Sequence, residues 1–154
     1  MRKILIMAVL LSMFIFTTGC SSDKAPDIVI ENISIAPSSM KGEGVYSGYF
    51  TIRNNGGEDT FTGFMIPEFP EATFELHNVK DGSMYQIEHV NIPNGEIEFK
   101  KGGYHIMMFN MPSFRQLPDV FTIVFEFDKS GSITVPNVLK PEGVIVPTES
   151  SMKK

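Results

Sequence analysis

Hydrophobic and polar residues alternate along most of the chain after residue 26. Alternation with a period of two places apolar side chains on one face of a β-strand and polar side chains on the other. No segment of this region carries a convincing helical pattern, so we expect about nine strands. They span residues 27–36, 45–54, 59–66, 71–79, 83–92, 96–100, 104–109, 119–128 and 132–138.

The segments between the expected strands carry turn residues. Asn55-Gly56 and Asn94-Gly95 are pairs that favour tight hairpin turns. Many short strands at regular spacing are typical of an antiparallel β-sandwich with Greek-key connections. The chain has 154 residues, which suggests one domain with a core of the size that a sandwich needs. We assign this domain to residues 27–139 and a flexible tail to residues 140–154.

The N-terminal residues follow a different pattern. A basic start is followed by an apolar run from Ile4 to Phe16 and then by small residues that end in Cys20. This order is that of a secretory signal peptide, and the apolar run is too short for a comfortable transmembrane helix. We therefore expect residues 1–19 to be removed and the mature protein to be extracytoplasmic.

The end of this signal can be interpreted in two ways. The sequence TTGC resembles a bacterial lipobox, in which the Cys is lipidated, although Leu is usual where Thr17 stands. An ordinary peptidase site would instead leave Cys20 as a free thiol. The lipoprotein interpretation is favoured because the only Cys of the chain stands at the right place and a polar tether follows it within residues 20–26. A diacylated Cys20 would anchor the protein to a membrane surface.

Charge and cysteine content exclude several classes of function. Removal of residues 1–19 takes away two basic residues and no acidic one, which leaves 11 basic and 18 acidic residues and a net charge of −7. This balance argues against nucleic acid as a partner. The expected sandwich contains no Cys, so it can form neither an internal disulfide nor a thiolate metal site.

His and Met residues come together in the segment GGYHIMMFNM, residues 102–111. In a strand, His105 and Met107 point to the same face. A single His in a strand is more often a surface residue than a ligand, and Met is more often core filling. We interpret Met65 and Met108 as core filling. We expect His77 at a strand end, pointing outward.

The combination of imidazole and thioether changes this picture. Soft donors prefer a soft ion, and the pair suits Cu(I). Thioethers bind hard ions such as Mg²⁺ and Ca²⁺ poorly, and zinc normally takes Cys or carboxylate beside His. A blue-copper site needs a Cys thiolate, which the sandwich lacks. A His and Met site therefore indicates carriage of copper rather than its redox use.

Four segments resemble the PCu(A)C family of extracytoplasmic copper chaperones in order and context. They are YFTIRNNGGED, FELHNV with the following DGSM, IPNGEIEFKKGGYHIMM and FTIVFEFDKSGSITV. The resemblance extends over residues 28–138, and its most specific part is GGYHIM, which is similar to the His-x-Met motif of the family. It implies a cupredoxin-like β-sandwich that binds Cu(I) through two His and two Met. It also implies delivery of copper to the CuA centre of cytochrome c oxidase, alongside Sco-type proteins.

The resemblance also implies a ligand set. His77 matches the first His of the family, and His105 and Met107 match the His-x-Met pair. The position of the remaining Met is occupied here by Glu88, and the nearby turn is shorter. We take Met84 as the fourth ligand, with Met111 as its substitute. A site with only His77, His105 and Met107 is a third alternative.

His89 has no counterpart in the family, and we interpret it as a surface histidine.

Three classes of function follow from these observations. The first is a monomeric, membrane-anchored metallochaperone that passes Cu(I) by ligand exchange to a cytochrome c oxidase subunit or a Sco-like protein. The second is a surface lipoprotein that serves as a scaffold or interaction module without a metal, because folds of this kind host many functions. The third is an enzyme, which is the least supported because no catalytic set of residues stands out. We therefore expect no enzymatic activity and no catalytic residues.

Overall fold

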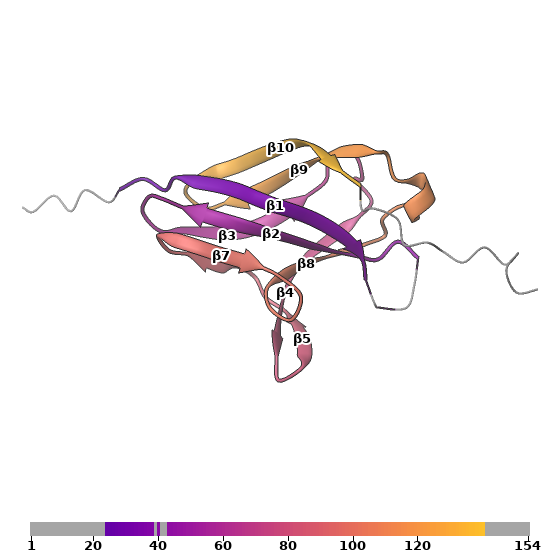
Figure 1. The fold of residues 1–154 in the computed structure, drawn as a ribbon, viewed down its shortest axis with the longest axis horizontal. Helices are drawn as coiled ribbons and strands as arrows, with labels where there is room; N and C mark the ends of the chain where they lie inside the picture. The colour runs from indigo at the N-terminus through magenta and orange to yellow at the C-terminus, as the bar shows by residue number, and fades with distance from the viewer. Residues whose placement is uncertain (1–23, 39, 41–42, 141–154) are drawn as a thin grey trace, which may run out of the picture.

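The computed structural model describes residues 24–38, 40 and 43–140. Their strands form two antiparallel sheets that pack face to face, as Figure 1 shows. This arrangement is the expected cupredoxin-like β-sandwich, so the predicted fold class is confirmed. Among the described residues, no helix has both the length and the apolar character needed to cross a membrane.

The first sheet has six strands. Its order is β1 (Ile28–Pro37), β2 (Tyr46–Asn54), β8 (His105–Phe109), β4 (Thr73–Lys80) and β5 (Ser83–Gln86), and β7 (Gly95–Phe99) also pairs with β2. The second sheet has four strands in the order β10 (Gly131–Leu139), β9 (Val120–Phe127), β3 (Asp59–Met65) and β6 (Val90–Ile92). A short 3₁₀ helix, η1 (Phe114–Gln116), connects β8 to β9.

The core between the sheets is built around Phe side chains. Phe50 of the first sheet stacks on Phe99 with 4.2 Å between ring centroids. It also meets Phe125 of the second sheet edge to face, at 4.9 Å. Aromatic pairs in these geometries add to the stabilisation that comes from burial alone. Alternation along β2 and β9 directs these rings inward, as the sequence pattern predicts.

One expected strand, residues 83–92, is divided between the two sheets. Its first part is β5, which pairs with β4, and its last part is β6, which pairs with β3. All of β5 is exposed, whereas Val90 and Ile92 of β6 are buried. The prediction of one strand is wrong here, because the change from an exposed to a buried segment requires the chain to leave one sheet for the other.

The first described residues contact the turn between β2 and β3. The Gly57 amide donates a hydrogen bond to the Ala25 carbonyl at 3.0 Å, and the Asn55 amide donates to the Asp27 carbonyl at 2.9 Å. Residues 24–26, assigned to a tether from the sequence, are thus held against the sandwich. The signal peptide, Cys20 and the tail after residue 140 lie outside the described residues.

A buried carboxylate fixes the turn between β9 and β10. The Asp59 oxygens accept hydrogen bonds from the Thr60, Lys129 and Ser130 amides at 2.7 to 2.9 Å and from the Ser130 hydroxyl at 2.6 Å. Burial would raise the pKa of the Asp59 carboxyl, but these hydrogen bonds outweigh it and lower the pKa. Asp59 therefore connects the start of β3 to a turn far away in the sequence.

We predict that Asp59→Ala lowers the free energy of unfolding at pH 7 by about 1–3 kcal/mol, because it leaves partly buried donors without their acceptor. Since the folded pKa is lowered, this stabilisation is present above the unfolded pKa of about 3.9 and is lost as the pH falls through the folded value. Denaturant unfolding at pH 7 and at low pH would measure it. The exposed Asp128 is the matched control: Asp128→Ala should have little effect, and an equal loss in both variants would contradict the account.

Candidate metal site

A cavity of about 490 Å³ lies against the face of the six-stranded sheet that is turned away from the core. It is lined on β2 by Ser47 and Tyr49, which alternate with the core residue Phe50. On β8 it is lined by His105 and Met107. The remaining walls come from the end of β1 and the segment after it, from the β4–β5 hairpin and from the turn before β8.

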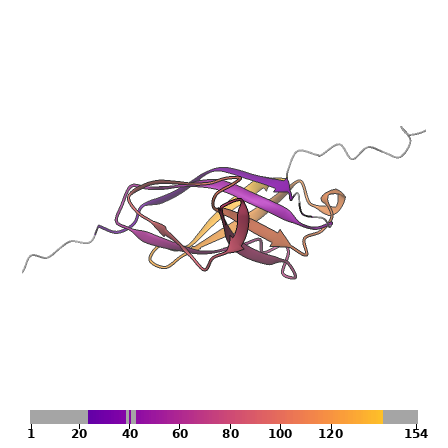
Figure 2. The ribbon, with the colours of Figure 1, turned by 90° about the horizontal axis from the view of Figure 1, so that it is seen from below.

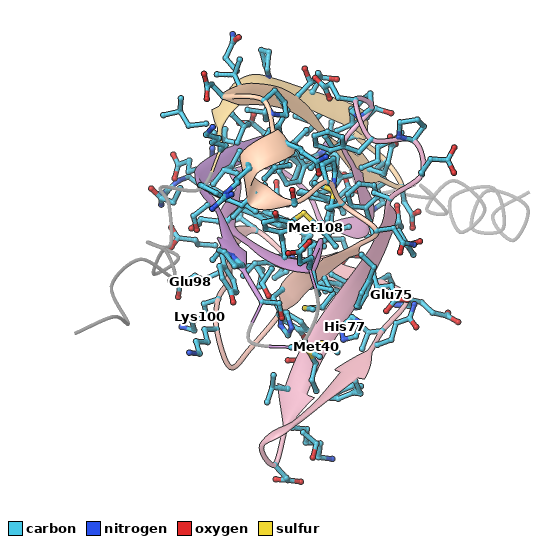
Figure 3. All side chains as sticks on the ribbon, turned by 90° about the vertical axis from the view of Figure 1, so that its right-hand side faces the viewer. Met40, Glu75, His77, Glu98, Lys100 and Met108 are labelled. Atoms are coloured by element: carbon cyan, nitrogen blue, oxygen red, sulfur yellow. The ribbon has the colours of Figure 1, made fainter. Side chains whose placement is uncertain are left out.

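The β4–β5 hairpin gives this face of the molecule its shape. In Figure 1 the hairpin projects downward from the sheets, and in Figure 2, seen from below, it points toward the viewer. Figure 3 shows Met40 and His77 on the side from which the β4–β5 hairpin projects, whereas Met108 lies between the two sheets. The hairpin thus forms one wall of the cavity, because Val79 and Met84, which pair across it, both line the cavity.

His105 is placed by an interruption in the pairing along β2. Both β7 and β8 pair with β2, along different parts of that strand. Between them the chain turns away from β2 from Lys100 to Tyr104. Gly102 in this turn has φ +82°, a conformation that favours glycine. The Gly103 carbonyl lies 2.8 Å from His105 Nδ1. A carbonyl can only accept, so Nδ1 carries the proton and donates it.

The other nitrogen of His105 faces a sulfur. In neutral His105 with its proton on Nδ1, Nε2 bears a free lone pair. Nε2 lies 3.0 Å from Met84 Sδ, and a thioether sulfur has lone pairs but no hydrogen to donate. Two atoms that can each donate a lone pair to a metal, His105 Nε2 and Met84 Sδ, therefore face each other. A cation bound between them would increase the distance from nitrogen to sulfur. Around a tetrahedral ion with metal–nitrogen bonds of about 2.0 Å and metal–sulfur bonds of about 2.3 Å, they would lie roughly 3.5 Å apart.

Met107 supplies a second sulfur from inside the protein. Its side chain is 1% exposed, although it points away from the hydrophobic core that Met108 joins from the opposite face of β8. The Ser47 hydroxyl donates a weak hydrogen bond to Met107 Sδ at 3.4 Å. The sulfur is thus oriented by its neighbours on β2 and open to the cavity.

His77 lies next to His105 across the β4–β8 pairing. The ring centroids are 5.8 Å apart. Two imidazoles on one ion, with metal–nitrogen bonds of about 2.0 Å, have centroids roughly 5–6 Å apart. The residue is 8% exposed and lies within β4 rather than at a strand end. The expected outward face is therefore correct, but the expected strand-end position is not, because β5 continues the sheet beyond His77.

One nitrogen of His77 has no hydrogen-bond partner. Nε2 lies 2.8 Å from Glu75 Oε2, two residues earlier on the same face of β4. A carboxylate accepts, so Nε2 carries the proton and Nδ1 bears the free lone pair. Nδ1 is the buried side-chain nitrogen or oxygen among the described residues that makes no hydrogen bond. Buried polar atoms are rarely left in this state without a functional reason, and a bound ion would satisfy it.

The other sequence candidates lie elsewhere. Met111 is part of the hydrophobic core, and His89 is exposed on the connection between β5 and β6. Met65, expected in the core, is 44% exposed, because its position at the end of β3 directs it outward. In the part of the chain that the structure covers, no three His, Cys, Asp or Glu side chains gather around one point.

Two residues of the site were missed by the sequence analysis. Glu75 stands two residues before His77, and residues two apart in a strand share a face, which was the available signal for it. Met40 lines the cavity from the segment after β1. A Met in the polar sequence PSSMKGEG has no local core to join, which was the only signal for it.

The fold and the cavity define the chain as a cupredoxin-like β-sandwich protein with imidazole and thioether donors gathered on one sheet face. The family model of LpqE-like lipoproteins matches residues 28–138. The chain therefore belongs to the LpqE-like family, and the match confirms the resemblance that its motifs indicated.

Solved structures show the same fold. The copper-bound PCuAC domain from PmoF2 superimposes with a TM-score of 0.56 at 17% identity, covering 75% of this chain and 93% of that one. The apo PCuAC domain from PmoF1 gives a TM-score of 0.58 at 18% identity, covering 75% of this chain and 94% of that one. No curated protein matches the sequence significantly.

We predict that neutral His77 and His105 adopt opposite tautomers, with the proton on Nε2 in His77 and on Nδ1 in His105. Nitrogen-15 NMR of the metal-free protein would measure this directly. Glu75→Leu should remove the preference of His77, whereas Glu75→Gln should preserve it, because the amide oxygen can still accept. His105 should be unchanged in both variants, and identical tautomers of the two rings in the wild type would contradict the hydrogen-bond assignment.

Proposed function

We propose that this protein is an extracytoplasmic metallochaperone that binds one Cu(I) and passes it on by ligand exchange. The ligands are His77, Met84, His105 and Met107. The observation that carries this proposal is the 3.0 Å approach of His105 Nε2 to Met84 Sδ. Two atoms with free lone pairs and no hydrogen between them are a natural place for a soft cation.

The hydrogen bonds of the two rings decide which atoms would bind. His105 would bind through Nε2, because its Nδ1 donates to Gly103. His77 would bind through Nδ1, because its Nε2 donates to Glu75. A carboxylate or carbonyl behind a ligating imidazole fixes the ring and raises its basicity. Both rings would thus be oriented before copper arrives.

The donor types favour copper over other ions. Two thioethers with two imidazoles suit Cu(I), because soft ligands select soft ions. Hard ions prefer oxygen ligands. Structural zinc sites are tetrahedral, and all four ligands are Cys or His side chains. The structural relative from PmoF2 is described as copper-bound, which supports the same ion here.

Transfer would need no covalent chemistry and no acid or base. An incoming donor from the recipient forms a bond to Cu(I) while the bond to one thioether breaks, and the copper remains Cu(I). Met84 is 39% exposed and is the ligand that a partner can reach, whereas Met107 is buried. We propose the CuA site of cytochrome c oxidase or a Sco-like protein as the recipient, following the family resemblance. The net negative charge of the chain favours a bound cation.

We further propose that the protein is anchored through lipidated Cys20, as a member of a lipoprotein family. The described chain begins beside the β2–β3 turn, at the start of β1, and the cavity lies at the other end of β1. Ten residues of strand span roughly 30 Å. An anchor before β1 would therefore hold the cavity away from the membrane surface, where a recipient domain can reach it.

We predict one Cu(I) per chain in a titration of the full chain against a colorimetric chelator, without oxygen and in a Cys20→Ser background that removes the competing thiol. Met84→Leu and Met107→Leu keep a similar volume but remove a sulfur. Each should weaken binding by about 100-fold or more, because loss of a hydrogen-bond partner of a ligand alone costs roughly 10–100-fold.

Met111→Leu is the matched control, because Met111 is a buried Met of the core. It should bind Cu(I) as the wild type does. A folded wild-type protein that binds no Cu(I) would refute the chaperone and favour the scaffold lipoprotein.

A further inference from the structure

Three thioethers, not two, line the cavity. Six Met residues lie in the described part of the chain, and Met40, Met84 and Met107 all line this one cavity. Met40 comes from the segment between β1 and β2, whereas Met84 comes from β5 and Met107 from β8. Three independent parts of the chain therefore bring the same soft donor to one place.

The backbone holds Met40 at the edge of the sheet. The Ser38 amide donates to the Val45 carbonyl at 3.0 Å, which closes the base of the segment between β1 and β2. The Met40 amide donates to the Ser38 hydroxyl at 3.2 Å. This hydrogen bond ties Met40 to Ser38, which lines the same cavity.

The exposure of the three Met residues forms a gradient. Met107 is 1% exposed, Met84 is 39% exposed and Met40 is 45% exposed. An exposed Met side chain gains little free energy from burial. Packing alone therefore does not explain why Met40 lines the cavity. Met40 lines the same cavity as His105 and Met84, so its thioether is available to an ion that enters this cavity.

We infer that Met40 is a further Cu(I) ligand, a third thioether that exchanges with Met84 on the same ion, so that Cu(I) keeps four donors. This inference rests on the proposed function and adds a residue to its site. Met40 and Met84 are both exposed, whereas Met107 is buried, so the Cu–S bond that a partner's donor replaces is the one to Met40 or Met84. One Cu–S bond breaks as the new bond forms, and no electron or proton moves.

The test is Cu(I) titration of the full chain carrying carbon-13 methyl-labelled Met, in the Cys20→Ser background and without oxygen. The methyl resonances of Met40, Met84 and Met107 should shift together and stop shifting at one equivalent of Cu(I). Met65 is the matched control, because it has nearly the same exposure, 44%, but lies on β3 in the other sheet. Its resonance should not move.

A substitution of Met40 distinguishes a copper ligand from an apolar side chain that only covers the cavity. Met40→Leu keeps the apolar volume but removes the sulfur, and it should weaken Cu(I) binding roughly tenfold, the lower end of what an outer contact of a metal site costs. Met65→Leu should bind as the wild type does. Both variants should unfold at the wild-type temperature without copper, because surface substitutions change stability little.

Two results would overturn the inference. If Met84 and Met107 shift while Met40 does not, and Met40→Leu binds as tightly as the wild type, Met40 only covers the cavity and the proposed function stands. If none of the three resonances shifts, the inference fails together with the copper site itself.

Discussion

The two-residue period of β8 is the constraint on which the core and the candidate site both depend. Ile106 and Met108 enter the hydrophobic core. His105 and Met107 alternate with them along the strand and face the cavity on the other side of the sheet. A one-residue slip of this strand would exchange the two faces. The register is held by β2 on one side and β4 on the other, so the packing of the sandwich also positions the donors.

The sequence predicts the parts of this arrangement that are local. Alternation predicts that His105 and Met107 are neighbours, and it places His77 on the face opposite Phe74 and Leu76. It also predicts the sandwich, because the turn residues divide the chain into short strands. It could not predict that residues 83–92 divide between two sheets, because pairing with β4 and with β3 is a long-range contact. The positions of Met40 and Met65 likewise depend on contacts between segments far apart in the chain.

The candidate site combines a rigid part with an open part. His77 and His105 are buried, and each ring is fixed by a hydrogen bond two residues away in the sequence, to Glu75 and to Gly103. Fixed rings lower the cost of ordering ligands when an ion binds. Met84 stands on an exposed hairpin instead. An ion held firmly on one side and loosely on the other can be retained and still be released, which is what a carrier requires.

X-ray absorption at the copper edge of the Cu(I)-loaded full chain tests the central claim most directly, again with Cys20 replaced by Ser. The account predicts a first shell that contains both nitrogen and sulfur, with imidazole scattering from the two rings and metal–sulfur distances near 2.3 Å, as for similar ions. A first shell of nitrogen and oxygen without sulfur would contradict it. That result would mean that the convergence of thioethers on this sheet face does not bind the metal.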